Sequence, residues 1–313
     1  MPELSPISIH TFLQPKYLLA VLFLASAAFV HFRGEVRHRF TRQLTDHSTF
    51  LAPINALIYL FSRVPSRPYQ QIEDFPQLQL LTDSWEVIRD EGLRLMDENR
   101  VGISTGYNDL GFISFFKTGW KRFYLKWYDD PLPSARQLCP KTVELLGRVP
   151  SVHGAMFALL PPGARLVRHR DPYAGSLRYH LGLRTPNNDG CYIEVDGQRR
   201  FWRDGQPMLF DETYIHFAQN TTDVNRLILF CDVERPLRGR LPTAVNRFFI
   251  HHVLKASATQ NVAGEPIGLV NRIFAPFYRW RLLSKRVKKW NRKVYYGLKY
   301  TATAGVLALI FLY

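Results

Sequence analysis

The sequence predicts a mainly β protein, an antiparallel sandwich or barrel such as a jelly roll, with flanking helices and a transmembrane helix at each end. From residue 154 onward, short apolar runs are separated by turn signals such as PPG, PNNDG and DGQ. An uncharged stretch lies close to each terminus. The 313 residues are 46% apolar, which is enough for one substantial core.

The first part, residues 1–70, is predicted to be a membrane anchor with a span at about residues 12–32. Several arginines follow this span. The alternative is a cleaved signal peptide, for which Ala25-Ser26-Ala27 resembles a cleavage site, but the start of the chain lacks a cationic region. A second apolar stretch, Ser48–Phe61, contains Pro53 and is too short to span. It is expected to lie at the membrane interface or on the domain, before a Pro-containing linker.

The second part, residues 71–236, is predicted to be the functional domain. Residues 84–98 have the spacing of an amphipathic helix. Strands are predicted where apolar residues recur with the period of a β-strand. They are Ala155–Leu160, Leu177–Leu183, Cys191–Val195, Met208–Asp211 and Arg226–Val233.

The third part, residues 237–313, is predicted to be a basic membrane-proximal segment that ends in a transmembrane helix at about residues 294–313. A buried C-terminal helix is the alternative, which the many cations upstream disfavour. The basic clusters lie at the two ends of residues 33–299, each on the side of its apolar stretch that faces the middle of the chain. By the positive-inside rule, these residues are cytoplasmic and both termini are periplasmic in a bacterium.

The net charge of +15 does not indicate a nucleic-acid binder, because residues 71–234 carry 19 basic and 22 acidic side chains. The excess positive charge lies in the two flanks, beside the predicted spans. Three cysteines without CxxC spacing indicate neither a disulfide framework nor a thiolate zinc site.

Candidate metal ligands occur in His169-Arg170-Asp171. Side chains at i and i+2 of an extended segment point the same way, so His169 and Asp171 can meet one ion. His216, after the strand-like MLFD, is the candidate third ligand. Two histidines and one carboxylate suit a non-heme Fe(II) oxygenase, although zinc remains possible with the same ligands.

Three further polar residues indicate an anionic ligand. Arg226 opens an apolar run, where a buried arginine needs an anionic partner. In the predicted strand around residue 180, Arg178 and His180 share one face. They face either the interior or the solvent, and the nearby metal-ligand pattern favours the interior.

The stretches HRDPYAGSLRYHLGL (residues 169–183) and MLFDETYIHFAQNTTDVNRLILFCDV (residues 208–233) resemble the aspartyl/asparaginyl β-hydroxylase family of Fe(II)- and 2-oxoglutarate-dependent dioxygenases. With the membrane-anchored ends, the chain looks most like the bacterial lipid A 2-hydroxylase branch. The resemblance implies a cupin-like double-stranded β-helix with Fe(II), and with 2-oxoglutarate and O2 as co-substrates. It implies that His169 and His216 bind iron, and that Arg178, His180 and Arg226 hold 2-oxoglutarate.

The chain departs from the family pattern at two positions. Asp171 completes a triad where the animal members have Gly. Ala158 stands where those members have a Ser that helps to hold the co-substrate, which puts part of that contact set in doubt.

The expected activity is 2-hydroxylation of a secondary acyl chain of lipid A, or of its precursor, at the cytoplasmic face of the bacterial inner membrane. The basic tail would suit an anionic lipid, but orientation alone would also explain it. The alternatives are a peptidyl aspartyl/asparaginyl β-hydroxylase and a non-catalytic cupin-like membrane protein. The set His169, Asp171, His216 and Arg226 argues against the latter, because a binding module would not need it.

Overall fold

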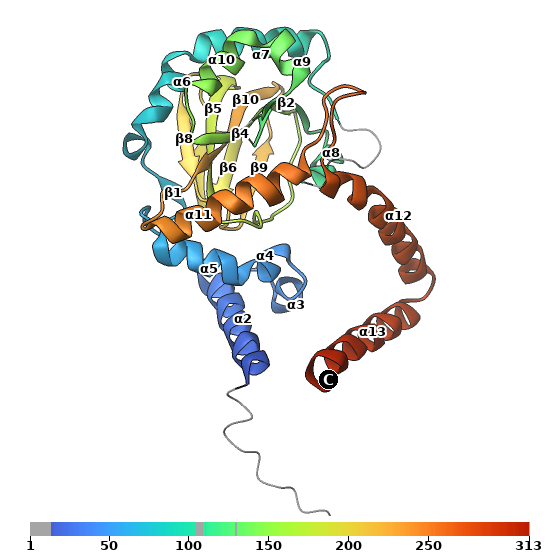
Figure 1. The fold of residues 1–313 in the computed structure, drawn as a ribbon. Coiled ribbons are helices and arrows are strands. Elements are labelled where there is room, and N and C mark those ends of the chain that lie inside the picture. Colours follow the sequence, from blue (N-terminus) through green and yellow to red (C-terminus); the bar gives the residue numbers. More distant parts are fainter. Residues whose placement is uncertain (1–13, 104–108, 110, 129, 313) are drawn as a thin grey trace, which may run out of the picture.

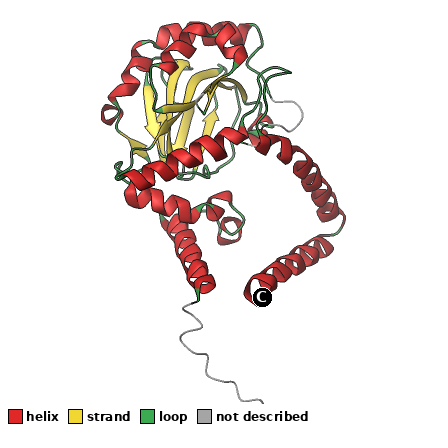
Figure 2. Ribbon diagram, viewed as in Figure 1, coloured by secondary structure: helices red, strands yellow, loops and turns green. Residues whose placement is uncertain are grey.

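The structure is a computed structural model that describes residues 14–103, 109, 111–128 and 130–312. Two antiparallel sheets form its centre, and helices cover the outer face of the larger sheet (Figures 1 and 2). Residues 12 and 13 of the predicted N-terminal span, and residue 313 of the predicted C-terminal span, lie outside the described residues.

The larger sheet has the strand order β1-β8-β5-β10-β4-β2-β3 and the smaller sheet has the order β7-β6-β9. The bounds of the larger sheet are β1 Tyr69–Gln70, β2 Lys121–Trp127, β3 Asp130–Pro131, β4 Val152–Leu160, β5 Ser176–Arg184, β8 Pro207–Phe210 and β10 Arg226–Glu234. Those of the smaller sheet are β6 Cys191–Val195, β7 Gln198–Phe201 and β9 His216–Asn220.

The two antiparallel sheets confirm the predicted β core. The five predicted strands correspond to β4, β5, β6, β8 and β10, and each end agrees within three residues. Strands β1, β2, β3, β7 and β9 were not predicted from the sequence. Strand β2 has the sequence KRFYLKW and is buried over most of its length. Its cations interrupt the apolar pattern from which a buried strand would be predicted. Strand β9 begins at the candidate ligand His216.

Strand β5 is buried on both faces. On one face, the Tyr179 hydroxyl lies 3.0 Å from that of Thr82 in α6 (Gln79–Asp83). Helix α7 (Trp85–Asp97) covers the same side of the sheet, and a Cβ at its Gly92 would lie 3.1 Å from the Phe157 ring. The opposite face of β5 carries Arg178 and His180 into the interior, so the solvent-facing alternative for these two residues is wrong.

Helix α7 confirms the helix predicted over residues 84–98. Besides α6 and α7, further helices lie around the two sheets. They are α3 Phe40–Gln43, α4 His47–Phe50, α5 Ala52–Phe61, α8 Ile113–Phe116, α9 Pro133–Leu138, α10 Pro140–Gly147 and α11 Arg240–Phe249.

Helix α2 (Pro15–Phe32) projects away from the sheets (Figure 1). Among the described helices, it is the one long and apolar enough to cross a membrane. The shorter α5 packs on the domain through Ala52, Asn55 and Ile58, while Leu60 faces outward. The stretch predicted to be interfacial or packed on the domain is therefore packed through one face.

The chain after α11 forms two long helices, α12 (Leu269–Trp290) and α13 (Arg292–Leu312), joined by a bend (Figure 1). Helix α13, which has 21 residues, overlaps the predicted C-terminal span, but α2 is the one helix among the described residues that meets both the length and the composition of a spanning helix. The second transmembrane helix therefore stays a prediction.

Candidate active site

The three predicted metal ligands come together between the two sheets. The backbones of His169 and His216 pair through two hydrogen bonds of 3.0 and 2.8 Å, so the two imidazole centroids lie 4.2 Å apart. An Asp171 carboxylate oxygen lies 3.6 Å from Nε2 of His169. One ligand atom from each residue lies within 4.8 Å of the others, close enough for all three to meet one ion.

Both histidines present Nε2 to this point. Nδ1 of His169 donates to the Val167 carbonyl at 2.7 Å, and Nδ1 of His216 donates to the Tyr214 carbonyl at 2.9 Å. Such bonds fix the tautomer and orientation of a ligating histidine. Burial lowers the pKa of His169 to about 3 and also lowers the pKa of His216, so both rings are neutral at physiological pH, as metal binding requires. The donor set fits Fe(II).

Arg178 lies at one end of the site among three carboxylates. It pairs with Asp171 at 2.6 Å, with Asp232 at 2.9 Å and with Glu212. Burial raises the pKa of Asp171, but Arg178 and the two histidines outweigh it and hold that pKa below its usual range. Asp171 is therefore an anion aimed at the two imidazoles.

Glu212 and Asp232 were not among the predicted site residues. Burial raises the pKa of both, although Arg178 opposes the shift. The Ser176 hydroxyl donates to Glu212 at 2.7 Å, and the Tyr128 hydroxyl donates to Asp232 at 3.0 Å. The available signal was an acid within the apolar run LILFCDV, since a buried acid needs a cationic partner.

Arg226 and His180 lie at the other end of the site, and neither has a carboxylate partner among the described residues. Arg226 is 2% exposed, stacks on Trp202 at 4.4 Å, and leaves its Nε without a hydrogen-bond partner there. Both ring nitrogens of His180 are likewise buried and unpartnered. Burial lowers the pKa of Arg226 to about 10, so it is still a cation at neutral pH. A buried cation without an anion is costly unless a ligand supplies one.

All six predicted site residues line one cavity together with aromatic side chains. The six are His169, Asp171, Arg178, His180, His216 and Arg226. Ala158 does not line it, being buried in β4 opposite Ile228 of β10.

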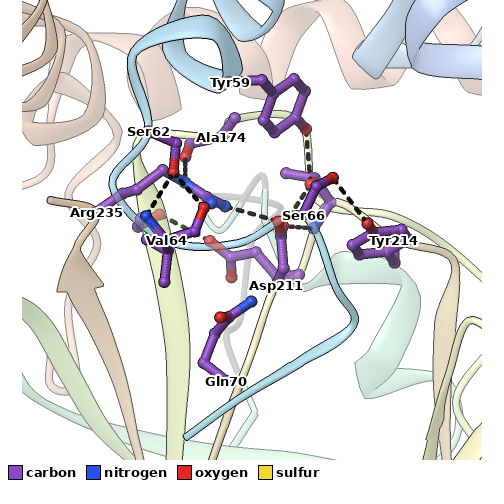
Figure 3. A network of polar contacts seen from close by, with 12 residues as sticks. Tyr59, Ser62, Val64, Ser66, Gln70, Ala174, Asp211, Tyr214 and Arg235 are labelled. Atoms are coloured by element: carbon purple, nitrogen blue, oxygen red, sulfur yellow. Dashed lines mark hydrogen bonds and ion pairs between the residues drawn. The ribbon is translucent and has the colours of Figure 1, made fainter. Parts of the chain in front are cut away.

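The segments that carry the ligands are held by the chain that follows α2. Asp211, five residues before His216, pairs with Arg33 at 2.6 Å and Arg235 at 2.8 Å (Figure 3 shows Asp211 and Arg235). Burial raises the pKa of Asp211, but the two arginines outweigh it and hold that pKa below its usual range. The Tyr59 hydroxyl of α5 donates to Thr213 at 2.7 Å.

The segment of the other two ligands is tied to the same region. Arg170 donates to the Val30 carbonyl at 2.8 Å. Asn55 of α5 donates to the Pro172 carbonyl at 2.8 Å and accepts from the Ala174 backbone at 2.9 Å. Residues 30–61 thus brace both ligand-bearing segments.

Comparison with known proteins gives a family and several relatives. The family model described as Aspartyl/Asparaginyl beta-hydroxylase matches residues 82–236. An ornithine lipid ester-linked acyl 2-hydroxylase of Rhizobium tropici is 35% identical over 179 residues, which cover 57% of this chain and 56% of that protein. The human aspartyl/asparaginyl beta-hydroxylase is 30% identical over 161 residues, which cover 50% of this chain and 21% of that protein.

Among solved structures, a Pseudomonas putida prolyl-4-hydroxylase aligns with 50% of this chain and 88% of its own, with 18% identity and a TM-score of 0.33. This likeness is low, and the description of the fold rests on the strand order of the two antiparallel sheets. The match over residues 82–236 contains all six predicted site residues that line the cavity. The chain belongs to the aspartyl/asparaginyl β-hydroxylase family.

Proposed function

We propose that this protein is an Fe(II)- and 2-oxoglutarate-dependent dioxygenase that hydroxylates C2 of an ester-linked fatty acyl chain of a membrane lipid. The observation that carries this proposal is one cavity that joins a complete His-Asp-His set to a buried arginine with no carboxylate partner among the described residues. The first suits Fe(II), and the second suits a dicarboxylate co-substrate.

In this proposal, each residue has a separate task. His169, Asp171 and His216 hold Fe(II), which with 2-oxoglutarate and O2 supplies the oxidation that puts one oxygen atom on carbon and yields succinate and CO2. Arg226 pairs with the far carboxylate of 2-oxoglutarate, and His180 donates to it through a ring N–H. Arg178 orients Asp171 through their 2.6 Å ion pair. It could bind the co-substrate only if one of its ion pairs with a carboxylate of the protein were broken.

The substrate class is proposed from three supports. The Rhizobium tropici relative is named for an acyl 2-hydroxylase of an ornithine lipid. Helix α2 would hold the domain at a membrane, and the bracing of the ligand segments by residues 30–61 would hold the site close to that anchor. The finer proposal is a secondary acyl chain of lipid A or its precursor. An ornithine lipid is the second candidate, because of that relative's name.

The proposed location is the cytoplasmic face of the bacterial inner membrane, with α2 and α13 as two spans. The basic residues that follow α2 and precede α13 favour this orientation. Reporter fusions after residue 313 test it: a periplasmic C-terminus is expected, and a cytoplasmic one would contradict the second span.

The experiment for the activity offers several substrates in parallel. Purified full-length protein in detergent receives Fe(II), ascorbate and 2-oxoglutarate, with lipid A, an ornithine lipid, or a peptide containing Asp and Asn. Mass spectrometry would detect one added oxygen on an acyl chain, and hydrolysis with chromatography would place it at C2. Oxygen added to the peptide alone, with 2-oxoglutarate turnover coupled to it, would overturn the lipid proposal.

A further inference from the structure

A second cavity adjoins the metal-ligand site, and the two share Asp171, Arg178, Phe112 and Phe115 in their linings. Its volume is about 340 Å³, within the range of about 300–1,000 Å³ of small-molecule sites. A ligand in this cavity would therefore reach the candidate metal position from the side of Asp171, away from Arg226.

The lining of the second cavity is mostly apolar away from the shared end. Its apolar wall comes from segments far apart in the chain: Leu51, Tyr173, Phe249, Val253, Leu254 and Val270. Three of its four carboxylates, Asp171, Glu212 and Asp232, are grouped around Arg178, and the fourth, Asp109, is paired with Arg122. The cavity thus suits a ligand with a long apolar part, and a peptide would leave backbone polar groups unpaired against this wall.

The cavity wall is continuous with an exposed apolar surface. Phe50 and Phe248, which precede the wall residues Leu51 and Phe249, are 66% and 62% exposed. Val253 both lines the cavity and is 40% exposed, so it lies at the opening. Helices α5 and α11 lie side by side, on the side of the domain from which α2 projects (Figure 1).

We propose that this cavity binds one ester-linked acyl chain, which enters from the membrane between Leu51 and the segment Phe249–Leu254. Exposed apolar side chains around an opening on the side of a candidate span favour a lipid over a water-soluble occupant. The ester end of the chain, with the C2 carbon to be hydroxylated, would lie beside Asp171, whose side chain is 26% exposed so that the headgroup can extend outward there, and the apolar tail would extend toward the opening. This inference rests on the proposed function for the reaction, but the binding of the chain is independent of turnover.

The first experiment measures binding alone. Full-length protein in vesicles is irradiated with a palmitoyl ester that carries a diazirine in its chain, and adducts are mapped by mass spectrometry. Adducts at Leu51 and within residues 249–254 are expected. Adducts confined to α2 and to the outward-facing Leu60 and Leu241 would overturn the proposal. Correct adducts without hydroxylation would instead contradict the proposed function.

The second experiment fills the cavity. Val253→Trp should lower kcat/KM for a palmitoyl substrate by at least about 10- to 200-fold, the range for one extra or missing methylene in an apolar pocket, and should lower it less for shorter chains. Leu241→Trp, on the exposed face of α11, is the matched control and should change neither. Substrate-free turnover of 2-oxoglutarate should be equal in all three proteins.

A third variant covers the case in which Val253→Trp fails to fold. Val253→Ala widens the opening and should move the preferred acyl chain toward longer or branched chains. An unchanged chain-length profile in Val253→Ala, with hydroxylation intact, would contradict the cavity assignment.

Discussion

Arg178 and Arg226 lie on the neighbouring strands β5 and β10, line the same cavity and are both buried, yet their surroundings are opposite. Arg178 pairs with three carboxylates, whereas Arg226 stacks on Trp202 and pairs with no carboxylate among the described residues. At one end of the site, Arg178 therefore already has carboxylate partners. At the other end, Arg226 has none among the described residues.

This difference separates two uses of the same side chain. A buried ion with a full set of partners contributes to the structure and orients those partners, because removing it leaves them uncompensated. A buried ion without partners is kept at a cost to stability, which a ligand can offset. Both arginines are buried, so their partners decide which of them has a structural role and which binds a ligand.

The largest expected effect is at Asp171, where the Arg178 end meets the candidate metal. Asp171→Ala and His169→Ala should each lower turnover by more than about 100-fold, because loss of a ligand exceeds the 10–100-fold cost of losing an outer partner. Fe(II) affinity and succinate formation would be measured on folded protein. Asp223→Ala, in an exposed turn, is the control. Normal turnover in either ligand variant would refute the His-Asp-His set.

The next effect is on stability at the Arg178 end. Arg178→Met leaves Asp171, Glu212 and Asp232 without their cation, and should lower the free energy of unfolding by about 3–5 kcal/mol. Denaturant midpoints would measure it. Arg199→Met, which removes an exposed pair with Glu194, should have little effect. Equal midpoints for Arg178→Met and wild type would mean that the cluster does not support the fold.

The corresponding change at the other end should act on the co-substrate. Arg226→Ala should raise KM for 2-oxoglutarate by about 30-fold or more, since losing one partner of a buried charged pair costs about 2–5 kcal/mol. Arg226→Lys should recover part of the loss, because it keeps the charge without the fork. Arg203→Ala removes a partly exposed arginine paired with Asp189 and is the control. An unchanged KM would remove Arg226 from co-substrate binding.

Sequence patterns predicted the residues of this site better than they predicted its electrostatics. Alternation placed Arg178 and His180 on one face of β5, and the i, i+2 spacing placed His169 beside Asp171. The partners of Arg178 could not be predicted from the sequence. Asp232 lies opposite Arg178 only through the β5–β10 register, and Glu212 lies in a turn between two strands.

Strand β2 and the contacts of residues 30–61 with the ligand-bearing segments could not be predicted for similar reasons. In β2, Arg122 pairs with Asp109, and Lys126 donates to the Val152 carbonyl at 2.8 Å, so these two cations are buried although a local pattern would place them in solvent. The ion pair between Arg33 and Asp211 joins residues 178 positions apart in the chain, which no local pattern can reveal.

The smallest predicted effect has the opposite sign to that of Arg178→Met. Arg226→Met should raise the free energy of unfolding by about 1–3 kcal/mol, because it removes a desolvated cation while keeping an apolar contact with Trp202. The folded pKa of Arg226, about 10, lies below its usual 12.5. The cost is therefore fully present below pH 10 and falls as rising pH removes the proton from the folded form. The variant's advantage should narrow above pH 10.

Ligand linkage makes this last comparison decisive. Adding 2-oxoglutarate with Fe(II) at about 100 times its dissociation constant should stabilise the wild type by about 2.7 kcal/mol, and should stabilise Arg226→Met far less. The advantage of Arg226→Met in thermal midpoint should therefore shrink or reverse when the ligand is added. If Arg226→Met is less stable than the wild type without ligand, then Arg226 has a structural partner after all, and the two ends of the site do not differ in kind.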